Sequence, residues 1–145
     1  MKLTGKASVV REIKKYAKLY PDAVTTAIYQ EGLAVDADMV RNIPTDTSRL
    51  KNSHYVTQPM SSVKPIVEVG VGTDYAIYVH ERTELRHKVG RAKYLQVVKE
   101  RYQPRYAQDV LNFTRRNVAT GVKLATLKSA PTRPQTEQEF LGGGN

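Results

Sequence analysis

One stretch of the chain decides its fold: VEVGVGTDYAIYVHERT, residues 67–83. Within it, one hydrophobic periodicity gives way to another. The valines up to Val71 occupy every second position, which is the period of a β-strand with one buried face. From Tyr75 onward, the apolar residues have a spacing that suits one or two helical turns. The stretch therefore predicts a strand, a tight corner and a short helix.

Glycines make the corner between these two elements. They interrupt the strand, and Thr73-Asp74 supplies a side chain able to cap the helix that follows. Because tyrosine combines apolar area with a polar tip, the two tyrosines of the short helix are expected either to pack in the corner or to lie at an interface. The predicted corner residues are Gly70, Gly72, Tyr75 and Tyr78.

Two helices are predicted before the central stretch. Residues 8–20 place apolar side chains on one side and basic ones on the other, the pattern of an amphipathic helix. Pro21 is tolerated in a first helical turn and not in an interior, so it separates this helix from the next. Helical spacing then continues to Asn42, with Gly32 as a weak point of about 1 kcal/mol relative to alanine.

The remaining elements are shorter. Residues 45–50 contain turn and cap formers, and Asp46 or Thr47 is expected to cap a single helical turn. Residues 54–57 are rich in β-formers, and their short connection to the central strand favours an antiparallel pair. A third helical pattern starts at Ala92, and Pro104 should kink or split it.

Length and composition bound the architecture. A chain of 145 residues with 40% hydrophobic residues suffices for one domain with a modest core. We expect an α+β domain over residues 1–119, with helices packed on a small antiparallel sheet. Residues 120–145 have the composition of a segment that cannot fold alone, and we expect an extended C-terminal arm that a neighbouring subunit or partner orders.

Several classes of protein are excluded. The chain has no cysteine, so disulfide scaffolds, thiol catalysis and cysteine-ligated zinc are ruled out. No window approaches the roughly 20 apolar residues of a membrane span, and the N-terminus lacks the apolar run of a secretion signal. We therefore expect a soluble protein that no ordinary signal exports and that has no membrane partner.

The formal net charge of +9 is unevenly distributed. Eight cations face only two acids, Glu84 and Glu100, over residues 82–105. One interpretation is a patch that meets nucleic acid or an acidic protein ring, and the other is an ordinary solvated surface. The basic patch consists of Arg82, Arg86, Lys88, Arg91, Lys93, Lys99, Arg101 and Arg105.

No constellation of residues predicts catalysis. His80, Glu81 and His87 lack the spacing of the two-histidine turn that zinc hydrolases use. Asp36 and Asp38 lie two apart on a helix, so their side chains point in different directions and do not make an acid and base pair. We expect no enzyme activity, no cofactor and no metal.

A glycine turn and two serines are the remaining candidates for a catalytic or binding site. The turn at residues 70–72 lacks the rest of a phosphate-binding fingerprint. Ser48 and Ser53 have no histidine partner that the sequence can place nearby. Neither signal points to chemistry.

Three segments resemble motifs of one family. Residues 44–53, PTDTSRLKNS, resemble the P-x-(D)-T-G-x-L-x-x-S segment of the tail-completion, or head–tail joining, proteins of long-tailed bacteriophages. Residues 75–83, YAIYVHERT, are similar to its Y-A-x-Y-V-E-x-G-T, and residues 92–95, AKYL, to its A-x-(K/R)-F-L. In the right order, these motifs cover about residues 9–115. The chain thus resembles the neck proteins typified by a minor tail component of lambdoid siphophages.

The chain also departs from that pattern. Ser48 and Arg82 stand where the family prefers glycine. The Pro-Ala-Leu that often follows the last motif is absent, and the segment after Gly121 has no family counterpart.

The resemblance implies a structural protein of the virion without enzymatic activity. Such a subunit forms a homo-oligomeric ring, expected to be a hexamer, between the head connector and the tail. Its partners would be connector or stopper proteins and tail terminator or tail tube proteins, with non-specific contact to the DNA in the lumen. It would assemble in the host cytoplasm. The alternatives are a tail terminator or connector stopper ring subunit, or a free basic protein that binds nucleic acid.

Overall fold

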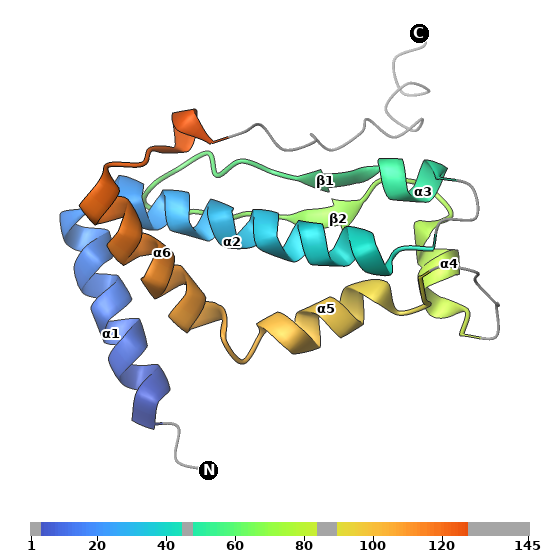
Figure 1. Ribbon diagram of the computed structural model, residues 1–145, viewed down its shortest axis with the longest axis horizontal. Coiled ribbons are helices and arrows are strands. Elements are labelled where there is room, and N and C mark those ends of the chain that lie inside the picture. The colour runs from blue at the N-terminus through green and yellow to red at the C-terminus, as the bar shows by residue number, and fades with distance from the viewer. Residues whose placement is uncertain (1–3, 45–47, 84–89, 128–145) are drawn as a thin grey trace, which may run out of the picture.

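The computed structural model describes residues 4–44, 48–83 and 90–127. It is an α+β structure in which helices dominate and the sheet is small (Figure 1). In chain order its elements are α1 (Thr4–Leu19), α2 (Pro21–Asn42), α3 (Arg49–Asn52), β1 (His54–Val56), β2 (Val69–Val71), α4 (Ala76–Glu81), α5 (Tyr94–Tyr102), α6 (Tyr106–Thr120) and the 3₁₀ turn η1 (Leu124–Thr126).

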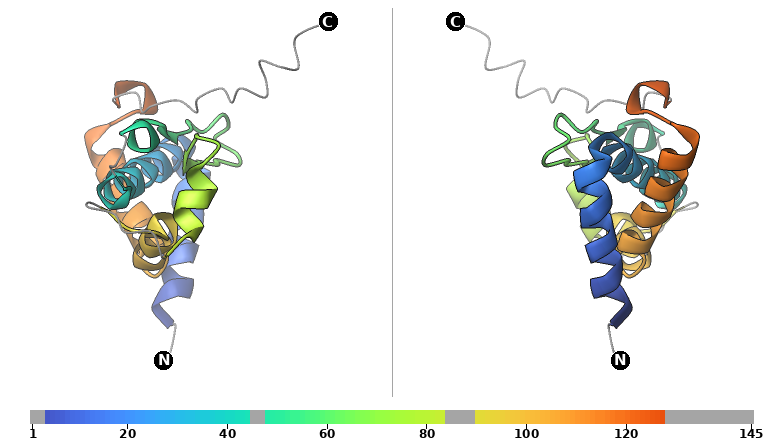
Figure 2. Two further views of the ribbon diagram at one scale, coloured as in Figure 1. Left: turned by 90° about the vertical axis from the view of Figure 1, so that its right-hand side faces the viewer. Right: turned by 90° about the vertical axis from the view of Figure 1, so that its left-hand side faces the viewer.

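Helix α2 is the element on which the others pack. It contacts α1 and α6 toward one end, α5 along another side, and both strands (Figures 1 and 2). Pro21 occupies its first turn, where a missing N–H costs nothing, and the chain leaves the helix at Ile43 in an extended conformation. The predicted bounds of this helix are confirmed. Helix α1 starts four residues before its predicted start and projects beyond the rest of the domain.

The core lies between the C-terminal half of α2 and the segments around the central stretch. Met39, Ile43 and Leu50 pack there with Ala76 and Tyr94. The hydroxyl of Tyr94 donates a hydrogen bond to the carbonyl oxygen of Ala76 at 3.4 Å, which satisfies the polar end of this buried ring. This contact joins α5 to α4, 18 positions apart in the sequence.

The two strands form the predicted antiparallel pair, in the register His54 with Val71, Tyr55 with Gly70 and Val56 with Val69. Gly70 is required there because a Cβ at this position would lie 2.8 Å from the Tyr55 hydroxyl oxygen. The alternating valines therefore flank a buried glycine. Val69 and Val71 pack partly against the core.

The capping prediction for the central stretch is wrong. Helix α4 begins at Ala76, with Tyr75 as its N-cap and no side-chain capping bond. The Thr73 backbone carbonyl, rather than the Thr73 or Asp74 side chain, accepts the Ala76 N–H at 3.1 Å. The turn before α4 therefore closes through the backbone.

Pro104 splits the third helical pattern into α5 and α6, as predicted. Helix α6 ends at Thr120, and Gly121 follows with φ +70°. The expected C-terminal arm is described only as far as residue 127, and its η1 turn contacts α2. The proposed caps of α3, Asp46 and Thr47, lie outside the described residues. The position before α3 is Ser48, whose side chain makes no capping bond.

Candidate functional site

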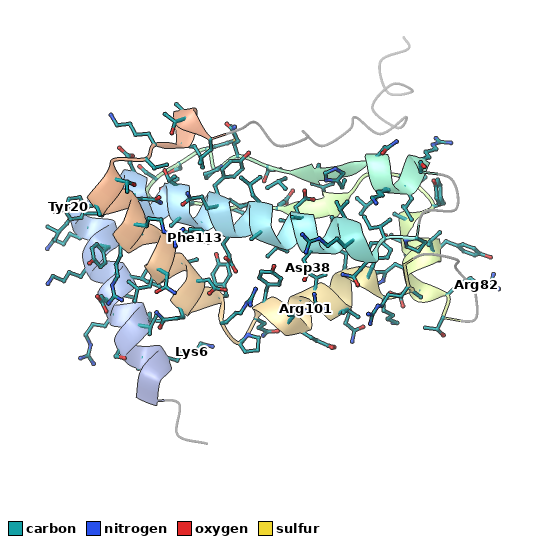
Figure 3. The ribbon with its side chains drawn as sticks, viewed as in Figure 1. Lys6, Tyr20, Asp38, Arg82, Arg101 and Phe113 are labelled. Carbon is teal, nitrogen blue, oxygen red and sulfur yellow. The ribbon has the colours of Figure 1, made fainter. Side chains whose placement is uncertain are left out.

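The basic patch divides into groups with different surroundings. Arg86 and Lys88 lie outside the described residues. Arg82, at the α4 end of the molecule, stacks on the Tyr78 ring with its guanidinium carbon 4.8 Å from the ring centroid (Figure 3). Lys93 Nζ lies 2.8 Å from Glu81 Oε2. These two cations are thus tied to side chains of α4.

Two further cations of the patch form ion pairs, one between two helices and the other at the start of α6. Arg101 on α5 forms a salt bridge with Asp38 on α2, and Figure 3 shows the two side by side. Arg105 Nε lies 3.1 Å from Asp109 Oδ2 at the start of α6, and its guanidinium carbon is 4.4 Å from the Tyr102 ring centroid. Part of the positive charge is therefore balanced within the fold.

The last two cations of the patch lie elsewhere. The Arg91 backbone N–H donates to the Asn42 carbonyl at 3.0 Å, which holds the chain beside the end of α2. Lys99 borders an apolar groove described below. The described basic residues thus extend from the α4 end to the junction of α5 and α6.

The corner is partly as predicted. The Gly72 N–H donates to the Ser53 carbonyl at 3.0 Å, and Tyr75 packs against the core. Tyr78, in contrast, is 54% exposed, so of the two places open to it, the core and an interface, its ring is outside the core of the subunit. A six-residue helix turns only one side toward the core, and α4 turns Ala76 and Val79 inward.

The acidic and histidine side chains on which chemistry could depend have structural partners. Asp36 contacts His54 and Asp38 contacts Arg101, so the two acids have different partners. His80 Nδ1 lies 2.8 Å from Glu81 Oε1. Within the described residues, no three histidine or acidic side chains gather as a metal site would require. His87 lies outside them.

A buried carboxyl that the sequence did not indicate lies between α2 and α6. Glu31 is 1% exposed and faces Asp109, and the two border a hollow of about 270 Å³. Burial, and after it the charge of Asp109, raise the pKa of Glu31 to about 7, against the opposing charge of Arg105. Only the position of Glu31 on the inner side of α2 could have revealed it, and the helical pattern around it is polar enough to read as surface.

An apolar groove of about 850 Å³ runs between α1 and the junction of α5 and α6. We call it the α1–α5 groove. Lys6 and Lys99 stand among the residues that border it. Its apolar wall includes Val9, Val35, Val69, Leu95, Val98 and Tyr102. Sequence reasoning missed it because these positions belong to four elements and each reads as an ordinary core residue.

Large apolar side chains are also exposed elsewhere among the described residues, on α1 with Leu19, at the α4 end and on the connection between β1 and β2. Ile77 on α4 is 77% exposed, beside Tyr78. Met60 and Val63, on the connection between β1 and β2, are also exposed, Val63 by 94%. This connection runs from the sheet back toward the end of the molecule opposite α4 (Figure 1).

Comparisons of the chain with protein families, with curated proteins and with solved structures found no match. Among residues 4–44, 48–83 and 90–127, no helix has the length and apolar character needed to cross a membrane.

Proposed function

We propose that this chain is a structural virion protein of a bacteriophage neck, whose subunits form a ring that joins the head connector to the tail. The ring is expected to be a hexamer. The protein works by forming interfaces, and we assign it no catalytic residue, cofactor or metal. Its partners are further copies of itself, the connector or stopper proteins, and the tail terminator or tail tube.

The backbone conformation of Ser48 is the observation that supports the motif resemblance. Ser48 has φ +54°, in the left-handed region that favours glycine, and it stands where the family motif has glycine. The turn before α3 thus has the backbone conformation for which that glycine would be selected. Arg82, the other departure, has φ −86°, a value open to any residue.

The exposed apolar residues support assembly into a ring. A ring forms when one surface of a subunit meets a different surface of the next. The α4 end, with Ile77 and Tyr78, and the β1–β2 connection, with Met60 and Val63, are two such separate surfaces. Exposed apolar side chains that gather in this way are typical of interaction sites.

The test is the mass of the protein in solution, measured by light scattering and followed by electron microscopy of the same sample. We expect closed rings of one subunit number, six by the resemblance. The double variant Ile77→Ser with Tyr78→Ser should remain folded and lose assembly. Wild-type protein that stays monomeric at every concentration, and also with purified neck partners, would contradict the proposal. The position of the ring relative to the tail and the connector, seen by electron microscopy with the neck partners present, would decide between tail completion, tail terminator and stopper.

The net charge of +9 favours a second candidate, a free protein that binds nucleic acid through its phosphates. This alternative predicts that the monomer binds duplex DNA with an affinity that falls steeply as salt rises. The pairing of Arg101 with Asp38, and of Arg105 with Asp109, reduces the charge available for it. Titration of a short duplex at two salt concentrations separates the two candidates.

A further inference from the structure

We propose that the α1–α5 groove receives Phe140 and Leu141 from the C-terminal segment of a neighbouring copy. The identity of the donor rests on the ring assembly proposed above. The choice of segment rests on the shape and charge of the groove and on the sequence of residues 128–145.

The groove has the character of a binding site for two apolar side chains. At about 850 Å³ it is within the range of small-ligand pockets, and Val35, Val69 and Val98 are among the residues that line it. It lies beside the projecting half of α1, which covers less of the domain than the rest of that helix.

The C-terminal segment matches the groove in both apolar content and charge. Phe140 and Leu141 are the only large apolar side chains in residues 128–145. The two acids of the segment, Glu137 and Glu139, come immediately before them, whereas its two cations, Lys128 and Arg133, lie further away along the chain. Residues 137–141 are therefore the acidic and apolar part of the segment. Lys6 and Lys99 stand at the groove, and α1 continues the positive charge with Arg11 and Lys14 beside a shallower hollow. An acidic and apolar peptide is therefore complementary to this surface.

Reach and direction favour a neighbour as the donor. The η1 turn and α5 lie on opposite sides of α2 (Figures 1 and 2). The segment leaves the described structure at Leu127, and the roughly 13 residues to Phe140 can span up to about 45 Å when extended. That length suffices to cross to an adjacent subunit, whereas docking on its own groove would require the segment to wrap around the domain.

Cross-linking tests the contact in the full-length protein, which has no cysteine of its own. One tagged chain carries Ala107→Cys, at the groove, and a co-expressed chain with a different tag carries Gly142→Cys, which leaves both apolar anchors intact. We expect a disulfide between the two differently tagged chains on a non-reducing gel. The matched control replaces Ala107→Cys by Ala37→Cys, an exposed site on α2 outside the groove and outside the proposed ring surfaces, and should give at least tenfold less of that product.

Each result decides the proposal. Assembled rings without the cross-link overturn the docking and leave the proposed function in place. A third variant carries both cysteines in one chain. If its disulfide forms within that chain, and none forms between chains, the segment binds its own groove, and the proposal that a neighbouring copy donates it is overturned. Wild-type protein that never assembles, shown by light scattering, contradicts the proposed function itself and removes the donor.

A peptide measurement tests the chemistry of recognition separately. A labelled peptide of residues 132–145 should bind the full-length variant Phe140→Ser with Leu141→Ser, whose own segment cannot compete. We expect at least tenfold weaker binding when the peptide carries the same two serines. Lys99→Glu in the protein should weaken binding about threefold, and less so at high salt, whereas Lys51→Glu on α3 should not. Equal binding of both peptides would overturn the assignment of the anchors.

Discussion

His54 on β1 and Asp36 on α2 share a hydrogen bond that ties the sheet to the central helix. His54 Nδ1 lies 2.9 Å from Asp36 Oδ1 and 3.0 Å from Oδ2. Asp36 is buried, so its carboxylate depends on this partner in place of water. The imidazole also holds the first residue of β1, which pairs with Val71 at the end of β2.

Removing the histidine should cost more than removing both partners. We expect His54→Ala to lower the free energy of unfolding by about 1–3 kcal/mol, because it leaves a buried carboxylate unpaired. The double variant with Asp36→Leu, which removes the charge and fills the space, should recover part of that loss. Urea denaturation followed by circular dichroism measures both. Equal stability of wild type and His54→Ala would show that the pair contributes nothing.

Glu31 makes the stability of the α2–α6 contact depend on pH. Its pKa of about 7 in the folded protein is above its ordinary value of 4.5. Between these values the native state binds more protons than the unfolded state, so stability falls as pH rises from about 4.5 to 7. Glu31 borders a hollow that water can enter, so we expect a loss on the order of 2 kcal/mol rather than the full shift at about 1.4 kcal/mol per pKa unit.

The variant Glu31→Gln should remove this dependence, since an amide can donate to Asp109 at every pH. Its free energy of unfolding, measured in urea from pH 4.5 to pH 8, should be flatter than that of the wild type and higher at pH 8. The control is Glu100→Gln on the exposed side of α5, whose curve should follow the wild type. If the free energy of unfolding depends on pH in the same way for wild type and Glu31→Gln, the prediction is wrong.

Replacing Ser48 with glycine should stabilise the protein. With φ +54°, a serine there carries a strain of about 1 kcal/mol that glycine lacks. We therefore expect Ser48→Gly to raise the free energy of unfolding by about 0.5–1 kcal/mol. The matched control is Ala37→Gly on the exposed side of α2, where the same residue should cost about 1 kcal/mol. A shared sign for both variants would contradict the left-handed conformation.

Tyr78 and Tyr94 should separate assembly from folding. Tyr94 is fully buried and bonded to Ala76, so Tyr94→Ala should destabilise the subunit by about 3–5 kcal/mol. Tyr78→Ala should change subunit stability by less than about 1 kcal/mol, since the ring is more than half exposed. If α4 contributes to the ring interface, Tyr78→Ala instead lowers the assembled fraction seen by light scattering. A large fall in melting temperature for Tyr78→Ala would place its ring in the core.

Element type and extent could be read from the sequence wherever the cause is local. Pro21 and Pro104 divide the helices because a missing N–H and a fixed φ act on the adjacent turn. The β-formers of residues 54–57 and the alternating valines gave an antiparallel pair, since a short connection leaves little other choice. The side-chain cap predicted for α4 is absent, because a backbone turn satisfies the first N–H group of this helix instead.

The candidate site was less accessible to prediction. The basic residues could be identified from the sequence, but their partners could not. Asp38 is 63 positions from Arg101, and no local sequence pattern indicates that the two side chains form a salt bridge. Tyr78 and Tyr75 read alike in a short helix, and only the packing of α4 turned one ring outward.

The sequence by itself determined which segments are helical and which are extended, which elements are amphipathic, and that the fold is of the α+β class. Those features follow from periodicity and backbone restriction over a few residues. The tertiary structure alone decided the burial of Glu31, the pairing of His54 with Asp36, and the α1–α5 groove. Each of these depends on the packing of elements distant in the chain, and that packing is set by the complementarity of whole faces rather than by any local pattern.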